Sequence, residues 1–183
     1  MKKKGLMPVY QAMLLLFTLF LASCADPKWT PEPVSDPKLD TSYQRMLVLP
    51  VGISAQFAKE YPQAAADCRA GLIVGLETSK RFQVSQVEAA PAKGAERGTL
   101  LVKLEITDVR IVSKLARGFG VLAGSSYVNL KMTLTDGHTG QVIRSKEFST
   151  RNNAFGAFYA GNDETIAQNM GRIVGDYITA VVP

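Results

Sequence analysis

One stretch decides the fold: Val128-Asn129-Leu130-Lys131-Met132-Thr133-Leu134-Thr135. Apolar and polar residues alternate throughout it, which is the period of a strand with one face toward a core and the other toward water. The stretch ends at Asp136-Gly137-His138-Thr139-Gly140, a glycine-bearing hairpin turn. We therefore expect a returning strand from Gln141 to about Thr150.

The strand before this hairpin is expected over Thr99–Val112. Its apolar residues occupy alternate positions as far as Ile106, after which the apolar phase moves to Val109 and Ile111. A β-bulge near Thr107 would produce such a shift. The three strands together predict an antiparallel meander.

The first half of the chain predicts a strand–helix–strand unit. Arg45–Val51 is a short apolar run that is typical of a buried strand, residues 62–80 have helical spacing, and Phe82–Val87 alternates as a strand with one wet face. Two strands joined through a helix in one sheet are normally parallel, with a right-handed crossover.

Both expected helices carry one apolar stripe. The first stripe is Ala65, Cys68, Leu72, Leu76 and Ser79, and the second is Ile166, Met170, Ile173, Val174, Tyr177, Ile178 and Val181. Gly71 and Gly75 are unfavourable inside a helix, which predicts close packing against a sheet or a second helix. Asn162 or Asp163 is the expected cap of the last helix. The fold class is thus α/β (α+β), with a mixed sheet of about five strands and both helices on one face.

The N-terminus has the parts of a secretory signal peptide. Three lysines precede an apolar run from Ala12 to Phe20, and small residues lead to a cysteine in Leu21-Ala22-Ser23-Cys24. The segment Leu21–Cys24 resembles the lipobox of bacterial lipoproteins. The resemblance implies that residues 1–23 are removed and that Cys24 carries a diacylglyceryl group and fatty acyl chains such as palmitate. The alternative is an uncleaved membrane anchor, for which the apolar run is too short.

Composition then divides the rest of the chain. Residues 24–43 form the lipid anchor and a proline-rich linker, and residues 44–183 have the length of a single globular α/β domain. Without its signal the chain has 18 basic and 16 acidic residues, because three lysines of the 21 basic residues lie in the signal. A net charge of about +2 does not indicate a nucleic-acid partner.

Two parts of the domain resemble known families. Met46-Leu47-Val48-Leu49-Pro50, a helix, and then Arg81-Phe82-Gln83-Val84 resemble the opening unit of the TolB amino-terminal domain, of the lipoprotein activator of penicillin-binding proteins and of the curli-secretion lipoprotein. Arg117-Gly118-Phe119-Gly120 with Gly124, and Asp136 with Thr139-Gly140, resemble a family of bacterial lipoproteins of unknown function. The resemblance implies the fold described above and supplies no catalytic residues.

Catalytic chemistry is not indicated. His138 is the only histidine and lies in a tight turn, and no cysteine–histidine cluster has the spacing of metal ligands. Gly118-x-Gly120-x-x-Ala123 fits a loose dinucleotide fingerprint, but a strand follows it where that motif requires a helix. We therefore expect no enzyme, no metal and no cofactor beyond the covalent lipid on Cys24.

Cys68 has no intramolecular partner if Cys24 is acylated. A lone thiol on the inner side of the first helix is expected to be buried and inert, and intermolecular pairing is the alternative.

Two glycine-rich loops, residues 117–126 and 152–161, contain apolar residues without a periodic place in the core. The candidate interaction residues there are Arg117, Phe119, Val121, Leu122, Phe155, Phe158 and Tyr159. In a meander both loops leave the same end of the sheet, so they can form one apolar patch. The alternative is that these aromatic residues fold back as a lid on the core.

The sequence thus predicts a lipid-anchored outer-membrane protein whose domain faces the periplasm. Its partners would be the bilayer, through Cys24, and another envelope protein that it binds or helps to assemble. A subunit of an oligomeric secretion or transport assembly, including a homo-oligomer, is the alternative. An envelope hydrolase is a third, less favoured, interpretation.

Overall fold

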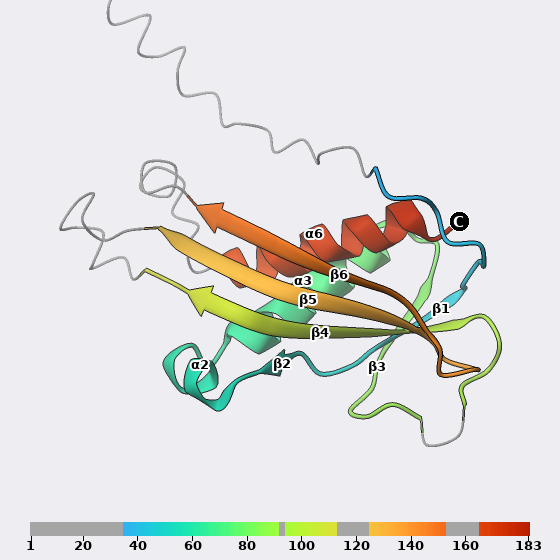
Figure 1. Ribbon diagram of the computed structural model, residues 1–183, viewed down its shortest axis with the longest axis horizontal. Helices are drawn as coiled ribbons and strands as arrows, with labels where there is room; N and C mark the ends of the chain where they lie inside the picture. The colour runs from blue at the N-terminus through green and yellow to red at the C-terminus, as the bar shows by residue number, and fades with distance from the viewer. Residues whose placement is uncertain (1–34, 92–93, 113–124, 153–164) are drawn as a thin grey trace, which may run out of the picture. The chain divides into compact units, whose positions relative to one another are not determined.

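The computed structural model describes residues 35–91, 94–112, 125–152 and 165–183 (Figure 1). Its elements are β1 (Arg45–Val48), β2 (Gly52–Ile53), α2 (Ala55–Glu60), α3 (Ala64–Thr78), β3 (Gln83–Gln86), β4 (Thr99–Arg110), β5 (Ser126–Asp136), β6 (Val142–Asn152) and α6 (Ile166–Val181). The sheet has the order β3-β1-β4-β5-β6, and β2 pairs with β4. It is mixed, because β1 is parallel to β3 and β4 whereas β4, β5 and β6 are antiparallel.

The predicted meander is confirmed. Ile106 of β4 lies opposite Leu130, and the next pair is Asp108 with Asn129, so Thr107 is the extra residue. This is the bulge that the apolar phase shift predicted. After it Val109 is buried, whereas Asp108 and Arg110, in the former apolar phase, are not.

The parallel strand–helix–strand unit is also confirmed, with α3 between β1 and β3. The expected five strands become six because the two-residue β2 pairs with β4. Helix α2 was not expected. It contains no buried residue and so has no apolar stripe to detect, although Ser54 caps it by accepting a 3.3 Å hydrogen bond from the Phe57 amide.

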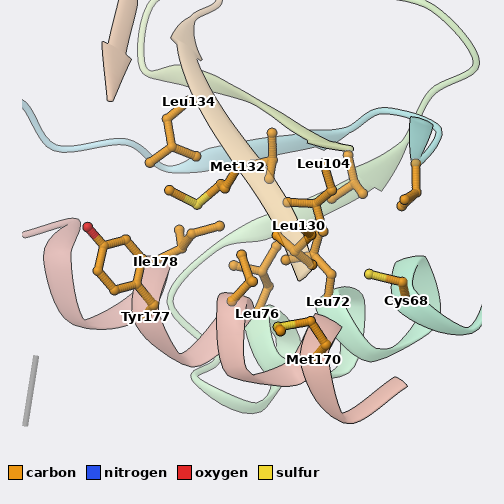
Figure 2. Close-up of a cluster of buried hydrophobic side chains, with 14 of the residues drawn as sticks. Cys68, Leu72, Leu76, Leu104, Leu130, Met132, Leu134, Met170, Tyr177 and Ile178 are labelled. Carbon is orange, nitrogen blue, oxygen red and sulfur yellow. The ribbon is translucent and has the colours of Figure 1, made fainter. Parts of the chain in front are cut away.

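Both long helices cover the same face of the sheet (Figure 1), as predicted. Figure 2 shows the core between these helices and the sheet, where side chains of β4 and β5 meet those of α3 and α6. Leu72, Leu130 and Met132 are fully buried or nearly so, while Val74 on the opposite side of α3 is 47% exposed. The apolar stripes thus locate the buried faces correctly.

Glycines allow α3 and α6 to touch backbone to backbone. A Cβ atom at Gly71 would lie 1.9 Å from the carbonyl oxygen of Gln168, and one at Gly171 would lie 1.9 Å from that of Cys68. Gly75 and Gly175 face each other further along the same contact. The close packing that was predicted from Gly71 and Gly75 is therefore against the second helix.

Arg69 interrupts the apolar side of α3 for a structural reason. Its Nη2 donates to the carbonyl oxygens of Val48 at 3.0 Å and Val87 at 2.8 Å, and its Nη1 donates to Glu88 at 3.3 Å. The guanidinium thereby joins the helix to the ends of the parallel strands β1 and β3.

The hairpin turn is organised by Asp136. Its Oδ1 accepts hydrogen bonds from the amides of His138 and Thr139 at 2.9 and 2.8 Å, and Gly140 takes a φ of +75°, which favours glycine. Chiefly because of the Thr139 amide, the pKa of Asp136 is lowered. Its Oδ2 accepts from the hydroxyl of Tyr43 at 3.0 Å.

Two boundaries differ from expectation. We expected order to begin near Gln44, but Leu39 and Tyr43 are only 7% and 5% exposed, and both belong to the core. A proline-rich composition concealed this packing. The N-terminal cap of α6 is Thr165, so the choice of Asn162 or Asp163 was wrong.

Candidate functional site

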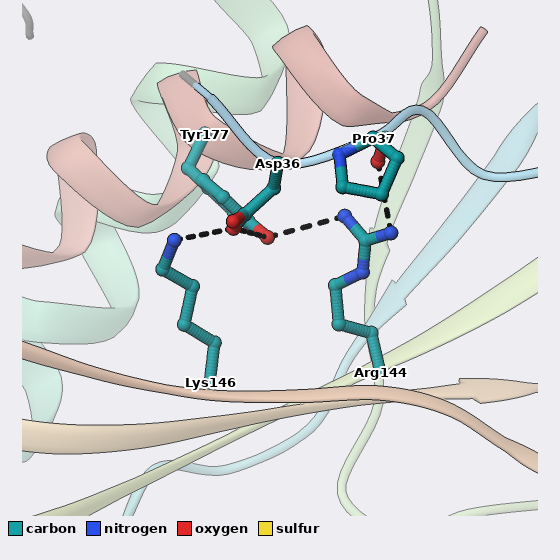
Figure 3. A network of polar contacts seen from close by, with 5 residues as sticks. All are labelled: Asp36, Pro37, Arg144, Lys146 and Tyr177. Atoms are coloured by element: carbon teal, nitrogen blue, oxygen red, sulfur yellow. Dashed lines mark hydrogen bonds and ion pairs between the residues drawn. The ribbon is translucent and has the colours of Figure 1, made fainter. Parts of the chain in front are cut away.

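A network of polar contacts joins the segment before β1 to β6 and to the C-terminal part of α6 (Figure 3). We name Asp36-Pro37-Lys38-Leu39 the tether segment, and its contacts Arg144, Lys146, Tyr177 and Val181 the tether-docking site. The Asp36 carboxylate accepts hydrogen bonds from Lys146 Nζ and, at 2.7 Å, from the Tyr177 hydroxyl. One carboxylate is therefore held by an ion pair and a phenol.

The backbone of the tether segment is held as well. Arg144 donates through Nη2 to the Pro37 carbonyl oxygen at 2.9 Å and through Nη1 to the Tyr177 hydroxyl at 3.2 Å. The Leu39 amide donates to the carbonyl oxygen of Val181 at 2.8 Å. Side chain, carbonyl and amide are thus all recognised within four residues.

Two aromatic rings lie beside the Lys146 ammonium group at this site. The rings of Phe148 and Tyr177 meet edge to face at 5.1 Å, and Lys146 Nζ lies 4.6 Å from the centre of the Tyr177 ring. Register explains why these residues meet: Arg144, Lys146 and Phe148 lie opposite Leu134, Met132 and Leu130 of β5, on the helix-covered face. The edge strand β6 therefore presents cations, instead of aliphatic residues, toward α6.

The electrostatics follow from these contacts. The Lys146 hydrogen bond is the main cause that lowers the pKa of Asp36, and the Tyr177 hydroxyl adds to it. Burial is the main cause that raises the pKa of Tyr177, with the bond to Asp36 adding to it. Both shifts favour an ionised carboxylate and a neutral phenol at neutral pH.

The opposite face of the sheet carries polar side chains. In β4, β5 and β6 its exposed residues include Lys103, Glu105, Lys131, Ser145 and Glu147. Glu105 lies opposite Lys131, which in turn lies opposite Glu147, so charge alternates across the three strands. This face provides polar contacts rather than an apolar docking surface.

The predicted interaction residues Arg117, Phe119, Val121, Leu122, Phe155, Phe158 and Tyr159 lie outside the described residues. The strand ends that flank them do lie together. Arg110 is opposite Tyr127, and Ser126 is opposite Asn152, so both loops leave the same end of the sheet. The topological part of that prediction is confirmed.

The remaining candidate residues are placed as follows. Cys24 lies outside the described residues. Cys68 is fully buried, as predicted, and burial raises the pKa of its thiol to about 12. His138 is exposed, and its Nδ1 lies 3.3 Å from the Ala95 carbonyl oxygen. Among the described residues, no group of three or more histidine, cysteine, aspartate or glutamate residues could hold a metal ion.

In the part of the chain that the structure describes, no helix has the length and apolar character that crossing a bilayer requires.

Sequence reasoning missed the tether-docking site. Tyr177 was assigned only to the apolar stripe, and Asp36 only to the linker. A signal existed in β6, where Arg144 and Lys146 occupy the same phase as Phe148. Cations in the core phase of a strand indicate an acceptor nearby, because a charge that faces the core requires a partner.

No protein-family model and no curated protein matches the chain. Its fold is similar to that of the PelC dodecamer from Paraburkholderia phytofirmans, with 13% identity over 78% of this chain and 93% of that chain and a TM-score of 0.52. Protein XCC0632 from Xanthomonas campestris, of the DUF330 family, shares 12% identity over 81% and 88%, with a TM-score of 0.50.

A weaker match is lipoprotein GNA1162 from Neisseria meningitidis, with 14% identity over 64% of this chain and 93% of that chain and a TM-score of 0.41. At these identities the comparisons show a shared fold only. A protein from a family of unknown function is among those of similar fold, which is the class of protein that the sequence resemblance suggested. The resemblance to TolB, the penicillin-binding-protein activator and the curli lipoprotein stays a prediction.

Proposed function

We propose that this chain is a lipid-anchored protein of the bacterial envelope that binds or helps to assemble another envelope protein, without catalysis. The observation that carries the proposal is the lipobox-like Leu21–Cys24 followed, twelve residues after the cysteine, by a tether segment that is docked on the domain. Such an arrangement gives a folded module a fixed point of attachment. Its fold is one that PelC and XCC0632 share.

The proposed location is the outer membrane, with the domain facing the periplasm. Ala25 follows the cysteine, whereas aspartate there is the usual signal for inner-membrane retention in enteric-type bacteria. Two or more acyl chains on Cys24 would anchor the chain stably, since each buried methylene contributes about 0.8 kcal/mol.

The proposed partner surface is the end of the sheet from which the two glycine-rich loops leave. Its candidate residues are the seven predicted from the sequence, of which Phe119 and Phe158 are chosen for the test, one from each loop. Loops at one end of a rigid sheet are a common place for binding groups. Because the described opposite face is polar and charged, an apolar contact fits the loop end better.

Aspartate substitutions test this surface. Phe119→Asp and Phe158→Asp should leave the melting temperature nearly unchanged while cross-links to the partner in native envelopes are lost. A matched control is Lys103→Asp on the exposed sheet face, which should keep the cross-links. A large drop in melting temperature for the phenylalanine variants would assign both residues to the core and remove the proposed surface.

A second candidate function is a subunit of a homo-oligomeric assembly. Strand β6 is eleven residues long and, among the described strands, pairs only with β5, so it offers an edge for another chain. The PelC protein of similar fold is described as a dodecamer. Mass measurement of the acylated protein in detergent separates the two: a discrete ring supports the assembly and a monomer supports the tethered accessory. An envelope hydrolase is the third, least supported, candidate.

A further inference from the structure

The tether segment is held at one place and connected to the domain at another. The side-chain hydrogen bonds that hold it come from β6 and α6, at least 107 residues further along the chain. Asp40, Thr41 and Ser42 lead from it to the buried Tyr43, and all three are exposed. A short exposed connection therefore separates the docked segment from the core residue that follows it.

Pro37 stiffens the tether segment. Its ring fixes its own φ, and it restricts the preceding residue, Asp36, to extended conformations. The carboxylate of Asp36 and the carbonyl group of Pro37, which Lys146 and Arg144 bind, are thus presented in a similar way before and after docking. The same segment from another chain would offer the site the same groups.

An unpaired strand edge lies beside the tether-docking site. Arg144 and Lys146 belong to β6, which among the described strands pairs only with β5. Val142, at the start of β6, is 56% exposed. A second copy that pairs with this edge would cover both features. It would also bring two docking sites close together, and the connection of each tether segment reaches about 10 Å when it is extended.

We propose that two copies of this chain exchange their tether segments, so that Asp36–Leu39 of each copy docks on Arg144, Lys146 and Tyr177 of the other. The inference deepens the second candidate function, the homo-oligomeric assembly, and rests on it. Exchange keeps every docking contact, because each site still receives one carboxylate, one carbonyl oxygen and one amide. Its cost is the new path of the connection and the association of two chains.

The docked segment must open before it can be exchanged. Opening breaks the ion pair between Asp36 and Lys146, whose side chains are 32% and 36% exposed, and such a pair contributes little to stability. Leu39 is the only buried residue of the tether segment, so it alone leaves the core. The hydrogen bonds between the strands stay in place, because the tether segment takes no part in them.

The ion pair itself reports which chain supplies the carboxylate. A water-soluble carbodiimide joins a carboxylate and an amine in contact as an amide. Unlabelled mature protein is mixed in detergent with an equal amount of protein that carries a heavy-nitrogen label, then treated, digested and examined by mass spectrometry. In the covalent dimer, about half of the joined Asp36–Lys146 peptide pairs should contain one peptide of each label. Asp36→Asn, which cannot be coupled, is the control and should give no such pair.

Charge reversal supplies a second test. Asp36→Lys and Lys146→Glu each break the ion pair within their own chain, whereas exchange between the two variants restores an ion pair at both sites. Native mass spectrometry of their mixture should show heterodimers well above the half, about 50%, that random pairing gives. The double variant Asp36→Lys/Lys146→Glu restores the pair within each chain and should show no such preference when it is mixed with the unsubstituted protein.

Peptide pairs of one label only, or heterodimers no more frequent than random pairing gives, would overturn the exchange. A discrete oligomer with pairs of one label only would do so while the second candidate function stands. A monomer at every concentration would remove both. The label experiment uses the unsubstituted chain, so misfolding of a variant does not affect it.

Discussion

The α3–α6 contact and the tether-docking site both join segments that are far apart in sequence, yet they do so in opposite ways. At Gly71 and Gly171, both of which are buried, two helix backbones touch. At the docking site a carboxylate and an ammonium group meet while the Asp36 and Lys146 side chains remain 32% and 36% exposed. The first contact cannot change without separating the helices, whereas opening the second removes only Leu39 from the core.

The comparison teaches which contact defines the fold and which is available for function. Backbone contact at glycines tolerates no added atom, because neighbouring backbone cannot move aside as a side chain can. An exposed ion pair contributes little to stability and exchanges readily with water. We therefore assign the stability of the fold to the helix contact and the attachment of the tether segment to the docking site.

The largest effect is expected from Gly171→Leu. The new Cβ would lie 1.9 Å from the carbonyl oxygen of Cys68, so the helices must separate and the free energy of unfolding should fall by about 3 kcal/mol or more. Urea denaturation measures this. Gly52→Ala is the control, because its Cβ would be 3.5 Å from the nearest atom, Cγ of Glu105. Equal stability of the two variants would refute the close helix contact.

The second effect is the protection of the Cys68 thiol from chemical labelling. Cys68 lies beside the helix contact. With a pKa of about 12 only about one thiol in ten thousand is ionised at pH 8, and the side chain is fully buried. Maleimide should label the native protein only after denaturation, as followed by mass spectrometry. Rapid labelling of the folded protein would mean that the apolar side of α3 has been placed wrongly.

Tyr177→Phe should have a modest effect, since it removes one hydroxyl and keeps the ring beside Phe148. The lost group donates to Asp36 and accepts from Arg144, so the free energy of unfolding should fall by about 1 kcal/mol. Thermal denaturation and amide exchange at Leu39 are the measurements. Exchange at Leu39 should accelerate while exchange at Leu130 in the core does not, and uniform acceleration would count against a separately opening site.

The smallest effect is the pH dependence of the docked tether. The folded-state pKa of Asp36 lies below its ordinary value of 3.8, so the stabilisation is fully present above that value and is lost as pH falls through the lower folded-state pKa. Exchange at the Leu39 amide, corrected for intrinsic pH effects, should therefore accelerate below about pH 4. Asp36→Asn should abolish this dependence, and its persistence in the variant would assign it to another group.

Much of the fold was predictable because it depends on local periodicity. Alternation in β5 and the phase shift at Thr107 located the meander and its bulge, and the helical stripes located the buried faces. Gly71 and Gly75 even indicated close packing, although not its partner. These features repeat within a few residues, so a single sequence contains them.

The docking site was not predictable in the same way. Asp36 and Lys146 are 110 residues apart, and each is an ordinary surface residue by composition. Proline-rich sequence suggested a free linker, and the core position of Leu39 depends on a carbonyl at the end of α6.

The most direct test of the central claim, a lipid-anchored envelope module, is metabolic labelling with radioactive palmitate followed by membrane fractionation. The unsubstituted chain should carry label, lose residues 1–23 and appear with the outer membrane. Cys24→Ser should carry no label and accumulate as unprocessed precursor. A Cys24→Ser chain that is matured normally and still fractionates with the outer membrane would contradict the account.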